Sequence, residues 1–475
     1  MRIVTSVRWA ALSQASRVIA QLISVSVLSR ILAPESYGLM SIAMTVTNLA
    51  FLFRDLGTSA TIIQRKELTE RMKSTVYWCN VALGCSIGLL LVLLAYPIAL
   101  IFKDERLAPI MMALAIVFPI ASLSLLHQAL LERESDFRLL ARIEIVSSIS
   151  GIAIALFLAY RGAGIWSLVM QMIGSTIITV IQLRWANRWR ARLVFSKEDL
   201  LSLFGFGGNF SLFQFVIYLE QNADSMIIGR LLGPGPLGIY SMAYKIMLFP
   251  LQNLTAVISR ALFPAFSRKQ DSIEEIANLY LRAVRIIAMA TAPLMAGMFF
   301  LRAEFVAILF GPQWSEVANI LKWLAPVGFL QAMTASTGVV FLSLGRARLM
   351  LMFGILGAFL QISAFLIGVH WGIEGVAACY LVAIIINFLP CFCCVARLLK
   401  IPFARLVIDF LKPLVASAVM LLALYEIHQL IMQIRPSQLG FVAINVMVGA
   451  LIYGVVLLVF LRQDISDIRS LAKFG

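Results

Sequence analysis

Residues 218–243 read YLEQNADSMIIGRLLGPGPLGIYSMA, and this stretch decides the fold. It begins with two acids, Glu220 and Asp224, inside an apolar run long enough to cross a bilayer, which takes about 20 residues. A charged side chain at that depth is costly in hydrocarbon, so it is a candidate for a functional group.

The second half of this stretch repeats the beginning of the chain. Residues 229–243 read GRLLGPGPLGIYSMA, and residues 29–43 read SRILAPESYGLMSIA. Identical residues recur at a constant offset of 200, including Pro34/Pro234 and Gly38/Gly238. A duplication of this kind indicates two related halves, an arrangement typical of transporters whose pathway lies between repeats.

The composition predicts an all-α polytopic membrane protein. The chain is 61% hydrophobic and 13% charged, and its mean hydropathy is +0.93. The first apolar stretch contains Arg17 and recurs at 209–230, so we interpret it as a transmembrane helix and not a signal peptide. We predict about fourteen spans, at 9–31, 37–56, 76–102, 108–131, 139–160, 164–184, 204–230, 237–259, 283–301, 317–342, 349–369, 373–396, 410–432 and 440–461.

The net charge of +15 follows from the predicted topology. Lys and Arg gather in alternate loops, as in 65–73, 188–197 and 397–412, whereas the intervening loops hold only scattered basic residues. This bias predicts an even number of spans with both termini cytoplasmic. It also accounts for the charge without a nucleic acid partner.

A second pair of matching stretches defines the domains. Gly164-Ile165 and Gly372-Ile373 each follow a short outer turn, now at an offset of 208. We therefore predict six-helix bundles at 1–190 and 191–400, related by a pseudo-twofold axis along the membrane normal, and two further helices with a cytoplasmic tail at 401–475. The basic segment 184–203 between the bundles is expected to form an amphipathic surface helix against anionic headgroups.

The duplication predicts where the intramembrane charges meet. Spans 1 and 7 are symmetry mates, so Arg17 and Glu220 should face a common axis. Together with Asp224, Lys245 and Arg54 they would line a central cavity. The candidate substrate-binding residues are Arg17, Lys245, Arg54, Gln21, Gln221 and Asn222, and the candidate ion-coupling or charge-balancing residues are Glu220 and Asp224.

Structural roles are the alternatives. Arg17 and Glu220 would then form an ion pair that locks two bundles, Asp224 would hydrogen-bond inside the first bundle, and Arg54 would snorkel to the inner interface. The cluster Cys391, Cys393 and Cys394 has no histidine or second pair at zinc spacing, so we predict packing and no metal site. No catalytic set and no P-loop stand out, so we predict no cofactor apart from a coupling proton or Na⁺.

Three stretches resemble one family. They are LSRILAPESYGLMSIA at 28–43, FRDLGTSATIIQRKELTE at 53–70, and the region 222–268. They are similar to bacterial polysaccharide-repeat flippases of the colanic-acid-exporter type, within the multidrug/oligosaccharide-lipid/polysaccharide exporter superfamily.

The resemblance implies a function. Such proteins move an undecaprenyl-pyrophosphate-linked oligosaccharide across the bacterial inner membrane for exopolysaccharide or lipopolysaccharide synthesis, by alternating access. It implies lipid-linked oligosaccharide and membrane lipids as partners, with polysaccharide polymerase and export machinery as further candidates. A cationic central cavity is a family property that Arg17 and Lys245 match, with Arg54 as a third candidate.

Three alternatives remain. An ion-coupled multidrug antiporter would need an acidic, aromatic cavity, and Arg17 and Lys245 would repel cationic drugs. A flippase for the peptidoglycan precursor fits the matched stretches less well. A membrane-embedded polymerase or transferase would need a large outer loop, which the sequence lacks.

Overall fold

The structure is a computed structural model of the chain. It describes residues 21, 23–54, 58, 62–63, 65, 68–187, 189–196, 215, 217–267, 272–433 and 437–460. These residues form α-helices, short 3-10 turns and loops, and none of them lies in a strand. The predicted all-α class is confirmed.

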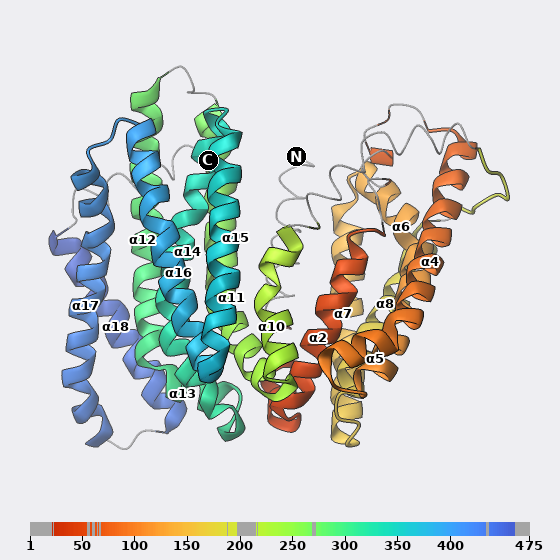
Figure 1. Ribbon diagram of the computed structural model, residues 1–475, viewed down its shortest axis with the longest axis horizontal. Coiled ribbons are helices and arrows are strands. Elements are labelled where there is room, and N and C mark those ends of the chain that lie inside the picture. The colour runs from red at the N-terminus through yellow and green to blue at the C-terminus, as the bar shows by residue number, and fades with distance from the viewer. Residues whose placement is uncertain are drawn as a thin grey trace. The chain divides into compact units, whose positions relative to one another are not determined.

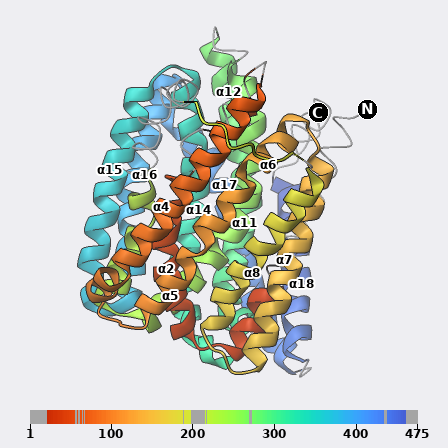
Figure 2. The same ribbon diagram turned by 90° about the vertical axis from the view of Figure 1, so that its right-hand side faces the viewer.

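The chain divides into two compact units, Met1–Gly238 and Ile239–Gly475. Unit 1 contains the helices α2 (Pro34–Phe51), α4 (Glu70–Phe102), α5 (Leu107–Ala115), α6 (Val117–Arg133), α7 (Phe137–Tyr160), α8 (Trp166–Ala186) and α10 (Ala223–Leu231) (Figure 1). Figure 2 shows α4, α6, α7 and α8 of this unit from the side.

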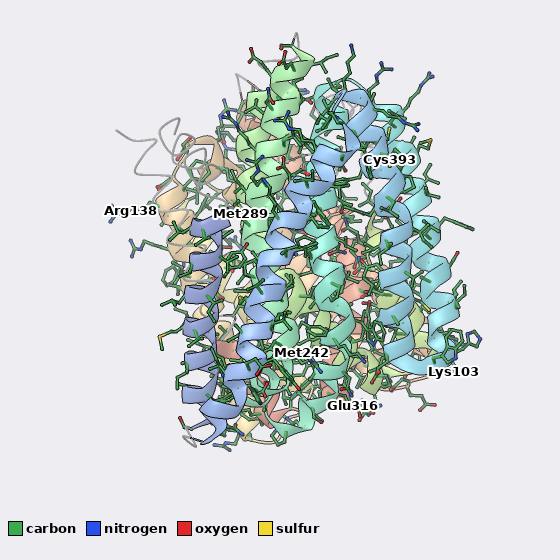
Figure 3. All side chains as sticks on the ribbon, turned by 90° about the vertical axis from the view of Figure 1, so that its left-hand side faces the viewer. Lys103, Arg138, Met242, Met289, Glu316 and Cys393 are labelled. Atoms are coloured by element: carbon green, nitrogen blue, oxygen red, sulfur yellow. The ribbon has the colours of Figure 1, made fainter. Side chains whose placement is uncertain are left out.

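Unit 2 begins in the first turns of α11 (Pro234–Ser267). It continues with α12 (Ile273–Phe300), α13 (Arg302–Leu309), η1 (Pro312–Trp314), α14 (Ser315–Ser343), α15 (Ala347–Gly368), η2 (Val369–Trp371), α16 (Gly372–Leu398), α17 (Phe403–Gln433) and α18 (Gln438–Phe460). In Figure 3, Glu316 at the start of α14 and Cys393 near the end of α16 lie toward opposite ends of this unit, as expected of long helices that run from end to end.

The same packing pattern occurs in both units. In unit 1, α4 packs on α6, α6 on α8, and α8 on α7; in unit 2, α12 packs on α14, α14 on α16, and α16 on α15. The turns agree, because Gly164 and Gly372 both have a positive φ, 55° and 73°, at the 208-residue offset. The backbone therefore shows the duplication in the later helices of each repeat as well.

Nine stretches of the described residues are long and apolar enough to cross a membrane, and one of them, Ala347–Leu398, contains both α15 and α16. The protein is thus a multi-pass membrane protein. The total of fourteen spans and the predicted domain limits at 190 and 400 stay predictions.

The amphipathic helix expected at 184–203 is wrong for the described part of that segment. Helix α8 ends at Ala186, and residues 189–196 run along α4 without helical structure. Side chains of α4 satisfy the backbone there: Arg192 N donates to Ser74 Oγ at 3.2 Å, and Ser196 N donates to Thr75 Oγ1 at 3.1 Å. The ring of Trp189 packs beside Tyr77 and His127, so packing on unit 1 holds this segment in a non-helical conformation.

A buried ion pair ties α17 to the bundle of unit 2. Arg285 on α12 donates to both carboxylate oxygens of Asp409 on α17, at 2.9 and 3.0 Å. Asp409 is 3% exposed. A buried carboxylate needs such a partner, so this pair fixes how α17 docks on α12.

The two copies of the duplicated motif contact each other in unit 1. α2 and α11 begin at Pro34 and Pro234, and proline is favoured in the first helical turn. One turn later the backbones of Gly38 and Gly238 meet: a Cβ on Gly38 would overlap the carbonyl oxygen of Pro234, and a Cβ on Gly238 would overlap that of Pro34. Each Cβ would also lie 3.0 Å from the backbone nitrogen of the other glycine. Only glycine allows this reciprocal contact.

We expect Gly38→Ala and Gly238→Ala each to destabilise the protein by about 1–3 kcal/mol, since the added methyl group forces two backbones apart. The melting temperature of the detergent-solubilised protein measures this effect. Gly235→Ala is the matched control, because nothing lies within 4 Å of a Cβ at that position. Equal melting temperatures for all three variants would contradict the close contact.

Candidate functional site

The predicted site residues are distributed over both units. Gln21, Arg54, Glu220, Gln221, Asn222 and Asp224 lie in unit 1, and Lys245 lies in unit 2. Arg17 lies outside the described residues. The predicted central cavity that brings all of them together therefore stays a prediction, and each residue is described within its own unit.

The seventh predicted span is interrupted in the middle of the candidate residues. Residues 217–221 are helical, Asn222 leaves the helix with φ −118° and ψ 10°, and α10 resumes at Ala223. The Asn222 side chain donates from Nδ2 to the carbonyl of Tyr218 at 2.9 Å. One of the predicted substrate-binding amides thus donates to the backbone at a helix break.

Tyr218 fixes this segment on α2. Its hydroxyl donates to the carbonyl oxygen of Thr45 at 2.7 Å, and the ring of Phe215 lies 6.1 Å from that of Phe53. The segment that carries Glu220 and Gln221 is therefore held against α2 by the Tyr218 hydrogen bond, and against the turn after α2 by the Phe215–Phe53 contact. Gln21 and Gln221 are exposed, and Glu220 is half-buried.

The two acids lie in different surroundings. Asp224 is 5% exposed, and its Oδ1 accepts a hydrogen bond from Ser225 N at 2.6 Å. This contact is local and favours the structural alternative for Asp224. Glu220 keeps the more accessible carboxylate and is the better candidate for exchange with water or an ion.

The two described candidate cations also differ. The guanidinium of Arg54 is half-buried and lies 4.9 Å from the ring centroid of Phe51, a cation–π contact. Lys245 is exposed on α11, although its neighbours Ala243, Ile246 and Met247 are buried. Lys245 is therefore an exposed basic residue whose neighbours on the helix are buried or partly buried.

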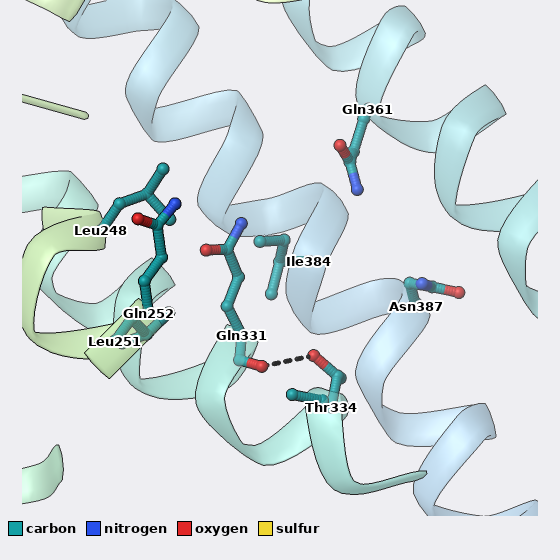
Figure 4. Close-up of a pocket in the computed structure, with 9 residues that line it drawn as sticks. Leu248, Leu251, Gln252, Gln331, Thr334, Gln361, Ile384 and Asn387 are labelled. Carbon is teal, nitrogen blue, oxygen red and sulfur yellow. Dashed lines mark hydrogen bonds between the residues drawn. The ribbon is translucent and has the colours of Figure 1, made fainter. Parts of the chain in front are cut away.

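Unit 2 also contains a cavity of about 410 Å³ lined by amides (Figure 4). Volumes of about 300–1,000 Å³ are typical of small-molecule sites. Gln252 of α11, Gln331 of α14 and Gln361 of α15 extend toward the same space, and Asn387 of α16 lines its wall. The remaining lining residues are Leu248, Leu251, Thr334, Ala335 and Ile384.

Two contacts fix the Gln331 side of this cavity, which we call the amide pocket. Gln331 Nε2 donates to the hydroxyl of Tyr380 at 2.6 Å, and Thr334 Oγ1 donates to the Gln331 carbonyl at 3.0 Å. Asn387 is placed by close packing, since a Cβ on Gly357 would stand 2.8 Å from Asn387 Nδ2. The pocket is thus built by specific contacts between helices.

Sequence reasoning missed the amide pocket. Its four amides come from four helices and share no motif, and only the topology brings them together. The available signal was the presence of Gln361 and Asn387 in apolar runs of membrane-spanning length, where a polar side chain is costly.

The fold and its accessible polar groups define a class of protein: a polytopic helical transporter built from two repeats. The family model described as polysaccharide biosynthesis protein matches residues 27–319, so the chain belongs to that family. The resemblance found in the sequence is confirmed.

Known proteins similar to this chain agree with that assignment. The lipopolysaccharide biosynthesis protein WzxC of Escherichia coli strain K12 is 27% identical over 81% of this chain and 79% of its own length. The teichuronic acid biosynthesis protein TuaB of Bacillus subtilis strain 168 is 28% identical over 95% of this chain and 94% of its own length. Among solved structures, the lipid II flippase MurJ in an inward closed conformation matches 97% of this chain and all of its own, 100%, with a TM-score of 0.77 at 15% identity.

We expect Tyr218→Phe to lower stability by about 1 kcal/mol, because it removes the hydrogen bond to Thr45 that holds the interrupted helix on α2. A lower melting temperature of the purified protein is the expected readout. Tyr160→Phe is the control, since Tyr160 is 76% exposed at the end of α7. If both variants have the same melting temperature, the hydrogen bond from Tyr218 to Thr45 does not hold the interrupted helix on α2.

Proposed function

We propose that this protein flips an undecaprenyl-pyrophosphate-linked oligosaccharide repeat unit from the cytoplasmic to the outer leaflet of a bacterial inner membrane. The proposal rests on two findings together: the chain belongs to a polysaccharide biosynthesis family, and it has the fold of a lipid II flippase. The flipped repeat would then pass to a polysaccharide polymerase and export machinery. The protein moves its substrate and does not change it chemically.

The physical problem is the charged head of the substrate. A pyrophosphate is a multiply charged anion that cannot enter hydrocarbon without groups that replace its hydration. The exposed ammonium of Lys245 is such a group, with Arg54 and Arg17 as further candidates. The polyprenyl tail is apolar and can remain in lipid while the head crosses.

The basic loops support the orientation. Arg346 lies between α14 and α15, Arg397 lies at the end of α16, and Arg282 lies in the third turn of α12. These three positions share one end of an up-and-down bundle, which would face the cytoplasm. Both termini would then be cytoplasmic.

The rival function is ion-coupled extrusion of cationic drugs. An exposed lysine on α11 repels such substrates and attracts anions. The amide pocket, which offers neutral donors and acceptors, likewise suits a sugar better than a hydrophobic cation. Both features favour the lipid-linked oligosaccharide.

We expect Lys245→Gln to reduce flipping about ten- to hundred-fold, since a hydrogen bond to a charged group contributes about 1.5–3 kcal/mol. Lys245→Arg should retain part of the activity. The measurement is the fraction of lipid-linked repeats in spheroplasts that a membrane-impermeant oxidant reaches; deletion of the protein should leave them on the inner leaflet. Lys322→Gln is the control, because Lys322 is also exposed but its Nζ lies over the Trp323 ring at 5.0 Å. Accessible repeats in the deletion strain would disprove the function.

Glu220 is the candidate for binding a coupling proton or Na⁺. In Glu220→Gln the carboxylate that would exchange the ion is gone, so flipping should no longer respond when the ion gradient is collapsed. The response is followed with the same oxidant assay and an ionophore. Asp224→Asn serves as the comparison, because its local hydrogen bond favours a structural role. Transport that remains fully sensitive in Glu220→Gln excludes Glu220 as the coupling residue.

A further inference from the structure

The amide pocket has the chemistry of a site for an uncharged, hydroxyl-rich ligand. None of its described lining residues is ionisable, and four of them are amides. An amide both donates and accepts hydrogen bonds, as a sugar hydroxyl does. Leu248, Leu251 and Ile384 add apolar surface that matches the C–H faces of a pyranose ring.

Three of the four amides have apolar counterparts in the first half of the chain, whereas the counterpart of Asn387 is Thr179. At the offsets of the duplication, Gln252 corresponds to Leu52, Gln331 to Leu123 and Gln361 to Ala153. The first half of the chain thus forms the corresponding helices with apolar residues at these positions. Placing amides in apolar helices costs free energy unless they are hydrogen-bonded. A bound ligand would supply hydrogen bonds beyond the one that Gln331 makes to Tyr380.

One of these amides retains an unused acceptor. Asn387 Oδ1 is buried, and no donor among the described residues hydrogen-bonds to it. Gln252 and Ala335 are exposed at the pocket, so a ligand has access to the cavity. A bound sugar would supply hydroxyl donors to amide acceptors of this kind.

The pocket also lies at a suitable distance from a cation. Lys245, Leu248 and Gln252 follow one another at helical spacing on α11, so they share one face of that helix. The seven residues from Lys245 to Gln252 rise about 11 Å, or two turns. An anionic group bound at Lys245 would thus lie about two helical turns from a sugar bound at Gln252. This separation suits the charged and neutral parts of one glycolipid head.

We propose that the amide pocket binds a neutral pyranose ring of the transported glycan, apart from the groups that bind its phosphates. This proposal rests on the proposed function and adds the place in unit 2 where the sugar is recognised. Sugar recognition would then be a property of one half of the transporter.

The test uses the full-length protein in nanodiscs and two probes that separate sugar from phosphate. Methyl glycosides of glucose, galactose and N-acetylglucosamine report on sugar binding by saturation-transfer-difference NMR. Farnesyl pyrophosphate, which carries no sugar, reports on the anion site by calorimetry. We expect at least one glycoside to bind saturably, with a dissociation constant in the millimolar range, as is usual for a single small polar ligand.

The variants are Gln361→Leu and Gln252→Leu, which remove one amide each without adding charge. Each should weaken glycoside binding at least five-fold and leave farnesyl pyrophosphate binding unchanged. Gln171→Leu is the matched control, because Gln171 is a half-buried amide on α8 outside the pocket. Size-exclusion profiles establish that every variant is folded.

Three results would overturn the proposal: no saturable binding of any glycoside, pocket variants that bind glycosides as the Gln171→Leu control does, or loss of farnesyl pyrophosphate binding in the pocket variants. None of them concerns flipping itself. If deletion of the protein leaves lipid-linked repeats on the inner leaflet while glycosides fail to bind, the proposed function is supported and the proposed sugar site is wrong. If glycosides bind at the pocket but deletion strands nothing, the proposed function fails instead.

Discussion

The structure depends on one constraint: hydrocarbon offers no partner for a polar group, so hydrogen bonds must be made within the protein. The described backbone meets it by forming helices. Many hydroxyl side chains meet it by folding back onto the preceding turn, as Thr47 does to the carbonyl of Ala43 at 2.6 Å and Thr291 to that of Ile287 at 2.7 Å. Asn445, fully buried in α18, donates in the same way to the carbonyl of Phe441 at 2.8 Å.

The polar groups of the protein are therefore of two kinds: those that other protein groups satisfy, and those that remain accessible to a ligand. Arg285 and Asp409 satisfy each other across two helices, so they fix packing and offer little to a substrate. Lys245 and Gln252 differ, because they are exposed on an apolar helix. If such groups lie at intramembrane depth, as the sequence predicts, they require water or a ligand beside them.

Much of the fold could be predicted from the sequence because the constant offset of the duplication aligns each helix of one repeat with a helix of the other. The prolines at 34 and 234 begin equivalent helices, and the glycines at 164 and 372 both adopt a positive φ. The segment after α8 could not be predicted, since Arg184, Arg188 and Arg192 fit a helical spacing while the hydroxyls of Ser74 and Thr75, far away in sequence, bind the extended backbone.

The candidate site was predicted less completely. A single charged residue in an apolar run can be recognised from the sequence alone, and Lys245 and Glu220 were identified in this way. Asn222 stays a predicted substrate ligand, and its Nδ2 donates to the backbone at a helix break that residue spacing does not reveal. The amide pocket depends on four helices meeting, and no local pattern encodes that meeting.

The reciprocal contact of Gly38 and Gly238 bears on how the molecule arose. Two copies of a residue touch each other only where they lie on a local symmetry axis. In an ancestor with a single copy, that glycine would have met itself across a homodimer, the commonest symmetric assembly. Fusion of two such copies would free each of them to change independently away from this contact.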